Sequence, residues 1–80
     1  MVGKKQTKEN KEVYKALGER IKDLRKEADF TNAGHFAYEN GFTASQYGQY
    51  ETGKDMRLST LIRIANIHNL TVSELLKDIV

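Results

Sequence analysis

Helix-ending residues divide this chain into short amphipathic segments, and this spacing restricts the fold more than any other feature of the sequence. Asn40-Gly41, Gly53 and Asn69 each follow a run in which apolar residues recur at three- and four-residue steps. Glycine, and less often asparagine, takes the left-handed conformation that ends a helix. Because apolar and polar residues do not alternate over any useful length, no strand is expected. The sequence therefore predicts an all-α chain.

The apolar stripes predict five helices. Their expected bounds are about 11–28, 33–40, 43–52, 58–68 and 71 to the last residue. Gly18 is expected to weaken the first helix, since glycine inside a helix costs about 1 kcal/mol relative to alanine. Five helices with short connections in 80 residues predict one compact five-helix bundle. The apolar faces of the two longest helices are expected at Val13, Leu17, Ile21, Leu24 and Ala28, and at Leu58, Leu61, Ile62 and Ala65, with Ile64 or Ile67 as a further member of the second face.

Two four-residue segments predict capping boxes. TASQ at 43–46 and TVSE at 71–74 both place threonine three residues before a side chain with an amide or carboxylate group. In such a box each of the two side chains accepts a hydrogen bond from a backbone amide that the helix leaves unpaired. The third and fifth helices are therefore expected to begin at these threonines.

The composition limits the kinds of site that the domain can carry and the compartment in which it is expected. The chain has no cysteine, which excludes disulfides and thiolate metal sites. No apolar run approaches the roughly 20 residues of a membrane span, and the lysine-rich N-terminus is not a signal peptide. The expectation is a cytoplasmic protein with no membrane contact. His35 and His68 lack the spacing of a metal site, and no nucleophile or carboxylate pair suggests an enzyme, so neither cofactor nor catalysis is expected.

Positive charge is concentrated near the N-terminus. Residues 1–30 carry nine Lys or Arg against six Asp or Glu, whereas residues 31–80 carry four against five. Residues 1–10 are predicted to form a flexible basic tail, with the folded domain at 11–80. Such a tail can contact phosphate or simply maintain solubility, and the second role is favoured for it.

The stretch from Phe36 to Gly53 carries the functional signal. A short helix ends at a glycine, a turn follows, and a second short helix begins at a capping threonine. A helix that enters the major groove must lack bulk and negative charge and must offer side chains that pair with base edges. Tyr47 and Tyr50 are expected to point into the core. The positions left facing outward are small or neutral: Ala44, Ser45, Gly48, Gln49 and Thr52.

Three segments in this order resemble the phage-repressor-like (Cro/XRE-type) helix-turn-helix family. They are LGERIKDLRKE, FAYENGFTASQYGQYETGK and LSTLIRIANIHNLTVSELL, and they span Leu17 to Leu76. The resemblance implies a lambda-repressor-like DNA-binding domain whose third helix reads DNA, usually as a homodimer on two half-sites. The function it implies is sequence-specific transcriptional regulation through double-stranded DNA.

Individual site residues follow from the resemblance, position by position. Ala44, Ser45 and Gln49 match the base-reading positions, and Gln49 is the best reader because its amide can pair bidentately with adenine. Arg25 and Glu51 match an ion pair that ties the first helix to the third.

The phosphate contacts predicted by the resemblance flank the reading helix. Thr43 precedes this helix, where its methyl group is also suited to a thymine methyl, while Thr52 and Lys54 follow it. Asn32 matches the start of the second helix, where unpaired amides favour an anion.

The chain departs from the family pattern in two places. One extra residue between Phe30 and Ala37 leaves open whether Asn32 or Ala33 takes the phosphate position. The loop after Gly53 is one residue shorter and puts Arg57 where a small capping residue is usual, so Arg57 is predicted to contact phosphate.

A second function stays open beside DNA binding. The third helix has no Lys or Arg, and the second half of the chain is not basic. These features also fit an antitoxin-like or other protein-interaction module with a protein partner on the same fold.

Overall fold

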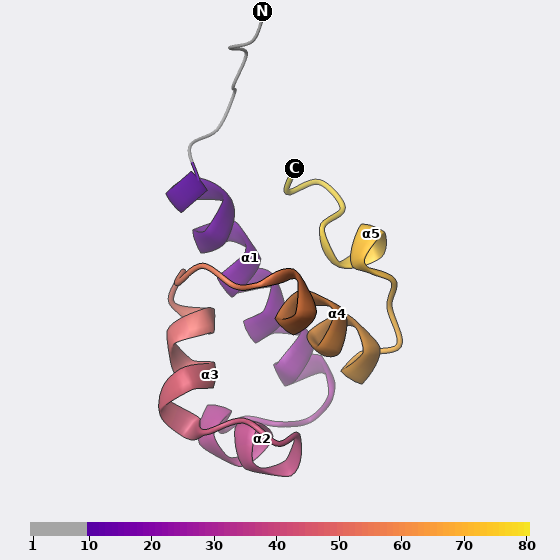
Figure 1. The fold of residues 1–80 in the computed structure, drawn as a ribbon. Coiled ribbons are helices and arrows are strands. Elements are labelled where there is room, and N and C mark those ends of the chain that lie inside the picture. The colour runs from indigo at the N-terminus through magenta and orange to yellow at the C-terminus, as the bar shows by residue number, and fades with distance from the viewer. Residues whose placement is uncertain (1–9) are drawn as a thin grey trace, which may run out of the picture.

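The computed structural model describes residues 10–80, and within that range the protein is all-α with five helices packed into a compact globule (Figure 1). This confirms the prediction of an all-α chain with five helices in one compact globule. The basic tail predicted at 1–10 lies, except for Asn10, outside the described residues. The helices are α1 (Asn10–Glu27), α2 (Ala33–Glu39), α3 (Ala44–Glu51), α4 (Leu58–Ile67) and α5 (Val72–Leu75).

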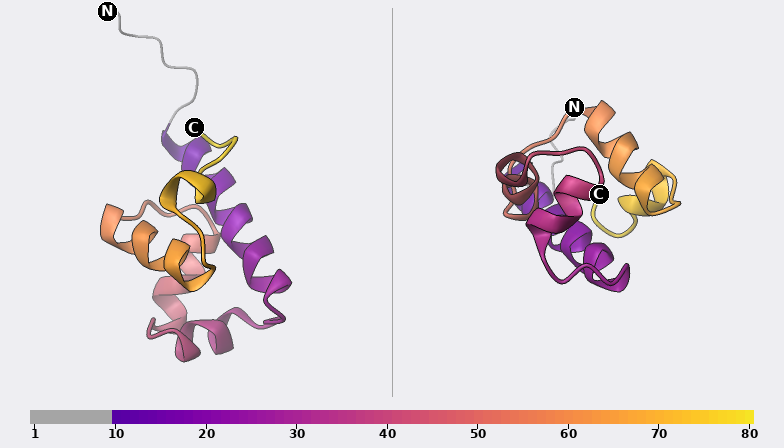
Figure 2. Two further views of the ribbon diagram at one scale, coloured as in Figure 1. Left: turned by 90° about the vertical axis from the view of Figure 1, so that its right-hand side faces the viewer. Right: turned by 90° about the horizontal axis from the view of Figure 1, so that it is seen from below.

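α1 is the longest helix, and the other four helices lie around it (Figure 1). Figures 1 and 2 show α2 at the C-terminal end of α1, with α5 and the end of the chain beside its N-terminal half. Side chains from all five helices meet between these elements. The six largest fully buried side chains are Leu17, Ile21, Phe36, Tyr47, Ile64 and Leu75.

Phe36 of α2 lies at the centre of an aromatic cluster. Its ring centroid is 5.0 Å from that of Tyr47 and 5.2 Å from that of Phe30. The His68 ring stacks on Phe36 with 5.6 Å between centroids and only 5° between planes. These contacts fix α2 against α3 and the C-terminal end of α4, because offset and edge-to-face aromatic pairs add to the stability that burial provides.

Two predicted faces are wrong in part. Ala28 lies exposed beyond the end of α1, and Leu58 and Ile62 on α4 are 64% and 44% exposed. The buried residues of α4 are Ala65, as predicted, and Ile64, one of the two alternatives for this face. Since α4 has apolar residues on more than one side, periodicity alone did not select the side that packs.

The end of the chain is a turn rather than the helix we predicted. α5 stops at Leu75, where Arg20 of α1 donates to the carbonyl oxygens of Leu75 and Glu74 at 2.7 and 3.1 Å. Asp78 then takes a left-handed conformation with φ 67°, and the Ile79 amide bonds to the Leu76 carbonyl oxygen. The turn returns Ile79 to the core, where it is 6% exposed.

Gly18 is where α1 and α3 approach most closely. A Cβ atom at this position would lie 2.6 Å from the Glu51 carbonyl oxygen and 2.7 Å from that of Tyr50. The residue predicted to weaken the helix is therefore required by the packing, because no larger side chain fits between the two backbones without moving one of them.

A bidentate ion pair joins the same two helices. Arg25 donates from Nε to Glu51 Oε2 at 2.7 Å and from its second terminal nitrogen to Oε1 at 3.1 Å, which confirms this predicted pair. The remaining terminal nitrogen donates to the Phe30 carbonyl oxygen at 2.8 Å. The hydrogen bond to Glu51 raises the pKa of Arg25, so the guanidinium stays charged although the side chain is buried.

Candidate nucleic-acid interface

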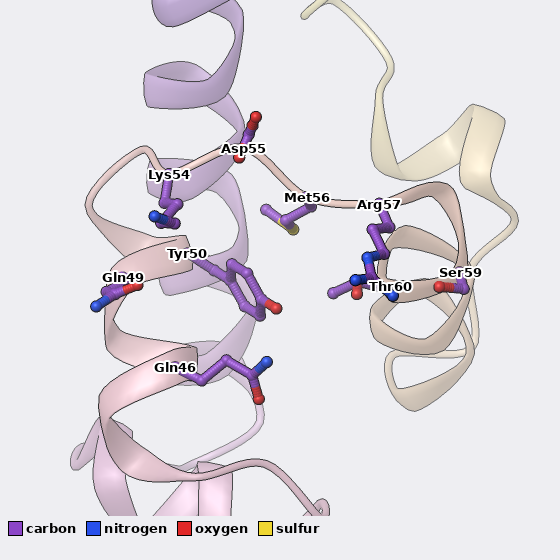
Figure 3. A pocket seen from close by; sticks show the side chains of 9 residues that line it. All are labelled: Gln46, Gln49, Tyr50, Lys54, Asp55, Met56, Arg57, Ser59 and Thr60. Atoms are coloured by element: carbon purple, nitrogen blue, oxygen red, sulfur yellow. The ribbon is translucent and has the colours of Figure 1, made fainter.

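The N-terminus of α3 is capped from one side only. The Thr43 hydroxyl accepts a hydrogen bond from the Gln46 amide at 3.1 Å, as predicted. The Gln46 side chain does not return the bond and points instead into a pocket between α3 and α4 (Figure 3). The predicted box at 71–74, by contrast, closes in both directions, at 3.0 and 2.8 Å. The capping role expected for the Gln46 side chain is therefore wrong.

The orientation of α3 agrees with the sequence prediction. Tyr47 is fully buried and Tyr50 is 9% exposed, so this face of α3 packs on the core. The other face holds the predicted base-reading residues Ala44, Ser45 and Gln49, all exposed. It carries no charged side chain, because Glu51 is turned inward to Arg25.

The start of α2 shows how Asn32 and Ala33 are placed. Asn32 is the N-cap residue, and its side-chain oxygen accepts a hydrogen bond from the His35 amide at 2.9 Å. Ala33 is the first helical residue. Asn32 is exposed and keeps its side-chain NH2 group for another acceptor, so a phosphate contact there is compatible with its capping bond.

Thr52 has a local partner that the sequence did not reveal. Its hydroxyl donates to the Gln49 carbonyl oxygen at 2.9 Å in the last turn of α3. A phosphate contact by this hydroxyl requires the bond to be exchanged, because a hydroxyl has one proton to donate. Thr52 thus secures the end of the helix while remaining exposed.

A cavity of about 580 Å³ separates α3 from the start of α4 (Figure 3). Tyr50 and Met56, both mostly buried, form part of its lining. Its charged residues are Lys54, Asp55 and Arg57, which gives two cations against one carboxylate. Its remaining lining residues are polar: Gln46, Gln49, Ser59 and Thr60. Sequence analysis did not identify Gln46, Ser59 or Thr60 as part of this surface.

Arg57 differs from the other arginines within residues 10–80. Arg20 and Arg63 donate to backbone carbonyl groups of distant segments, Arg25 donates to Glu51 and to the nearby Phe30 carbonyl oxygen, and Arg63 also lies 4.2 Å from the Phe42 ring centroid. The side chain of Arg57 makes no such bond and is exposed beside the pocket (Figure 3). Arg57 is also the N-cap residue of α4, which therefore begins without a side-chain cap.

Two buried polar atoms lack partners within the described chain. The Tyr47 hydroxyl and His68 Nε2 are both enclosed without a hydrogen bond. Burial raises the pKa of Tyr47 far above its usual range. Burial likewise lowers the pKa of His68, and the nearby Glu27 carboxylate offsets this only in part. Both groups are therefore neutral near pH 7 and belong to the core rather than to the candidate interface.

Other kinds of site have less support among residues 10–80. No group of three or more His, Cys, Asp or Glu residues is arranged to hold a metal ion there. In the same range, none of the helices combines the length and the apolar character that crossing a bilayer demands. No protein-family model, no curated protein and no solved structure matches this chain.

Proposed function

We propose that this protein is a sequence-specific DNA-binding transcriptional regulator in which α2 and α3 act as a helix-turn-helix. In this proposal α3 enters the major groove, where Ala44, Ser45 and Gln49 face the bases. The protein acts by binding and not by catalysis. Two copies bind as a homodimer on half-sites about one helical turn, or roughly 34 Å, apart.

One observation carries the proposal: the exposed face of α3 is uncharged and small, with two unpaired cationic side chains beside it. An ordinary solvated helix would carry a mixture of acids and bases on this face. The uncharged side chains here allow close approach to a polyanion. The cations Lys54 and Arg57 lie at the edge of the face, where a phosphate backbone passes when a helix occupies the groove.

The start of α4 supports a phosphate contact at the same edge. α4 has no acidic residue in its first turn and no side-chain cap, so its first amides remain available to an anion. Ser59 and Thr60 add hydroxyl groups to the pocket lining. Phosphate contacts at Arg57 and α4 on one side and at Asn32 on the other set the register of α3 on the duplex.

Binding to a random-sequence duplex library at two salt concentrations, followed by sequencing, tests the proposal. Enrichment of a palindromic motif and an affinity that falls as salt rises are expected. Replacing Lys54 and Arg57 together with alanine removes two phosphate contacts and should reduce the slope of log K against log salt by about 2. Lys22→Ala, at an exposed position of α1, is the matched control and should leave the slope unchanged. Absence of DNA binding at low salt would refute the proposal.

An alternative is an antitoxin-like or other protein-interaction module. The observation that favours it is the exposed pair Leu58 and Ile62, one turn apart on α4. Exposed apolar pairs of this kind suit a protein contact. The alternative predicts a stable complex with another protein that Leu58→Ser weakens, together with no salt-dependent DNA binding.

A further inference from the structure

The position of Gln46, three residues after the capping Thr43, suggests a capping role, but the Gln46 side chain does not take this role. In a complete capping box it would accept a bond from the Thr43 amide, but it extends toward Arg57 and Thr60 across the pocket (Figure 3). It is exposed and forms no side-chain hydrogen bond within residues 10–80. Its amide therefore has both a donor and an acceptor available to a ligand.

Gln46 and Gln49 are the only exposed side chains of α3 with this bidentate capacity. The other exposed positions of α3 carry a hydroxyl group or no polar side-chain group. α3 contains no lysine or arginine, the side chains that read guanine. A glutamine amide pairs bidentately with N6 and N7 of adenine in the major groove. The chemistry of α3 therefore favours A·T base pairs over G·C pairs.

The two amides reach different base pairs. Both residues line the pocket, but their amides extend in different directions: that of Gln46 toward α4 and that of Gln49 away from it (Figure 3). Three residues advance a helix by about 4.5 Å, between one and two base-pair steps of about 3.4 Å. Gly48 lies between them, and a Cβ atom there would meet nothing within 4 Å, so no side chain separates this part of α3 from DNA.

We infer that Gln46 is a second base-reading residue, so that each half-site contains one A·T pair read by Gln46 and another read by Gln49. This inference rests on the proposed entry of α3 into the major groove. It assigns Gln46 to direct readout, although its position three residues after a capping threonine suggests a purely structural role.

Sequencing of the DNA selected by the wild-type protein, Gln46→Ala and Asn66→Ala tests this inference. Asn66→Ala removes an exposed amide near the C-terminal end of α4, away from the pocket, and is the matched control. Alanine is the best helix former, so Gln46→Ala should fold. It should lose preference at one A·T pair of each half-site and bind the selected duplex about 5- to 150-fold more weakly, while its non-specific binding stays unchanged.

The outcomes separate this inference from the proposed function. If the wild-type protein selects a motif and Gln46→Ala selects the same motif with equal preference at every position, Gln46 is not a reader and DNA binding still stands. Loss of preference at a G·C pair would also overturn the adenine assignment. If the wild-type protein selects no motif, both proposals fail together.

Discussion

Alanine substitutions at Gly18 and Gly48 should have opposite effects on stability, although both glycines lie inside helices. Alanine in a helix interior is favoured over glycine by about 0.5–1 kcal/mol. At Gly48 the added Cβ would meet nothing within 4 Å, so Gly48→Ala should gain this amount. At Gly18 the Cβ would lie 2.6–2.9 Å from backbone atoms of Tyr50 and Glu51, where ordinary contacts begin at 3.4 Å.

The magnitude at Gly18 follows from what obstructs the new methyl group. Overpacking a close-packed site costs about 1–3 kcal/mol, and backbone carbonyl groups cannot rotate away as a side chain can. The upper half of that range therefore applies, and the helix-propensity gain reduces it to a net loss of about 1–2.5 kcal/mol. Since α1 and α3 must separate to admit the methyl group, the loss measures how closely they pack.

Urea unfolding of the two variants and the wild-type protein, followed by circular dichroism, measures both effects. Gly18→Ala should lower the midpoint and Gly48→Ala should raise it, with the m-value unchanged in each. A midpoint for Gly18→Ala at or above that of Gly48→Ala would refute the close crossing of α1 and α3.

Three further substitutions test the polar groups of the core. Glu51→Ala should cost about 3–5 kcal/mol in urea unfolding, because it leaves the buried Arg25 guanidinium without its carboxylate; a loss below about 1 kcal/mol would mean that the pair is solvated. Tyr47→Phe should change stability by less than about 1 kcal/mol, since the buried hydroxyl it removes lies near the Arg25–Glu51 pair without a well-aligned hydrogen bond, whereas a larger loss would reveal such a bond. Because burial lowers the pKa of His68, the unfolded chain binds more protons, and stability should fall as pH drops below about 6.5, by at most about 1.4 kcal/mol per pH unit. His68→Phe should remove this part of the pH dependence and His35→Gln, on the exposed face of α2, should not; equal profiles would contradict the assignment.

Most of the secondary structure could be predicted from the sequence because its signals are local. The caps at Thr43 and Thr71 bond to amides three residues ahead, and the glycine after Asn40 takes a φ of 81°. The inward side of α3 was also predictable, because Tyr47 and Tyr50 lie three residues apart on one face. The outward face, and with it most of the candidate site, follows from the inward one.

Tertiary contacts decided what each polar side chain does. Arg20 donates to the last residue of α5 from a position 55 residues away, and Arg25 forms an ion pair with Glu51. Arg57 alone among the arginines of residues 10–80 has a side chain with no hydrogen-bond partner there. In the sequence these residues look alike, since each is an arginine near a helix end or on a polar face.

The two threonine caps, and likewise the two helical glycines, look alike in the sequence but differ in their tertiary contacts. TASQ and TVSE have the same pattern, but only TVSE closes its box, while Gln46 turns to the pocket beside α4. Gly18 and Gly48 have the same helix propensity, but only Gly18 meets another backbone. Local patterns specify where the backbone turns and which face is apolar, because those signals act within about one helical turn. The partner of each remaining group depends on which segments the fold brings together, and only the tertiary structure determines that.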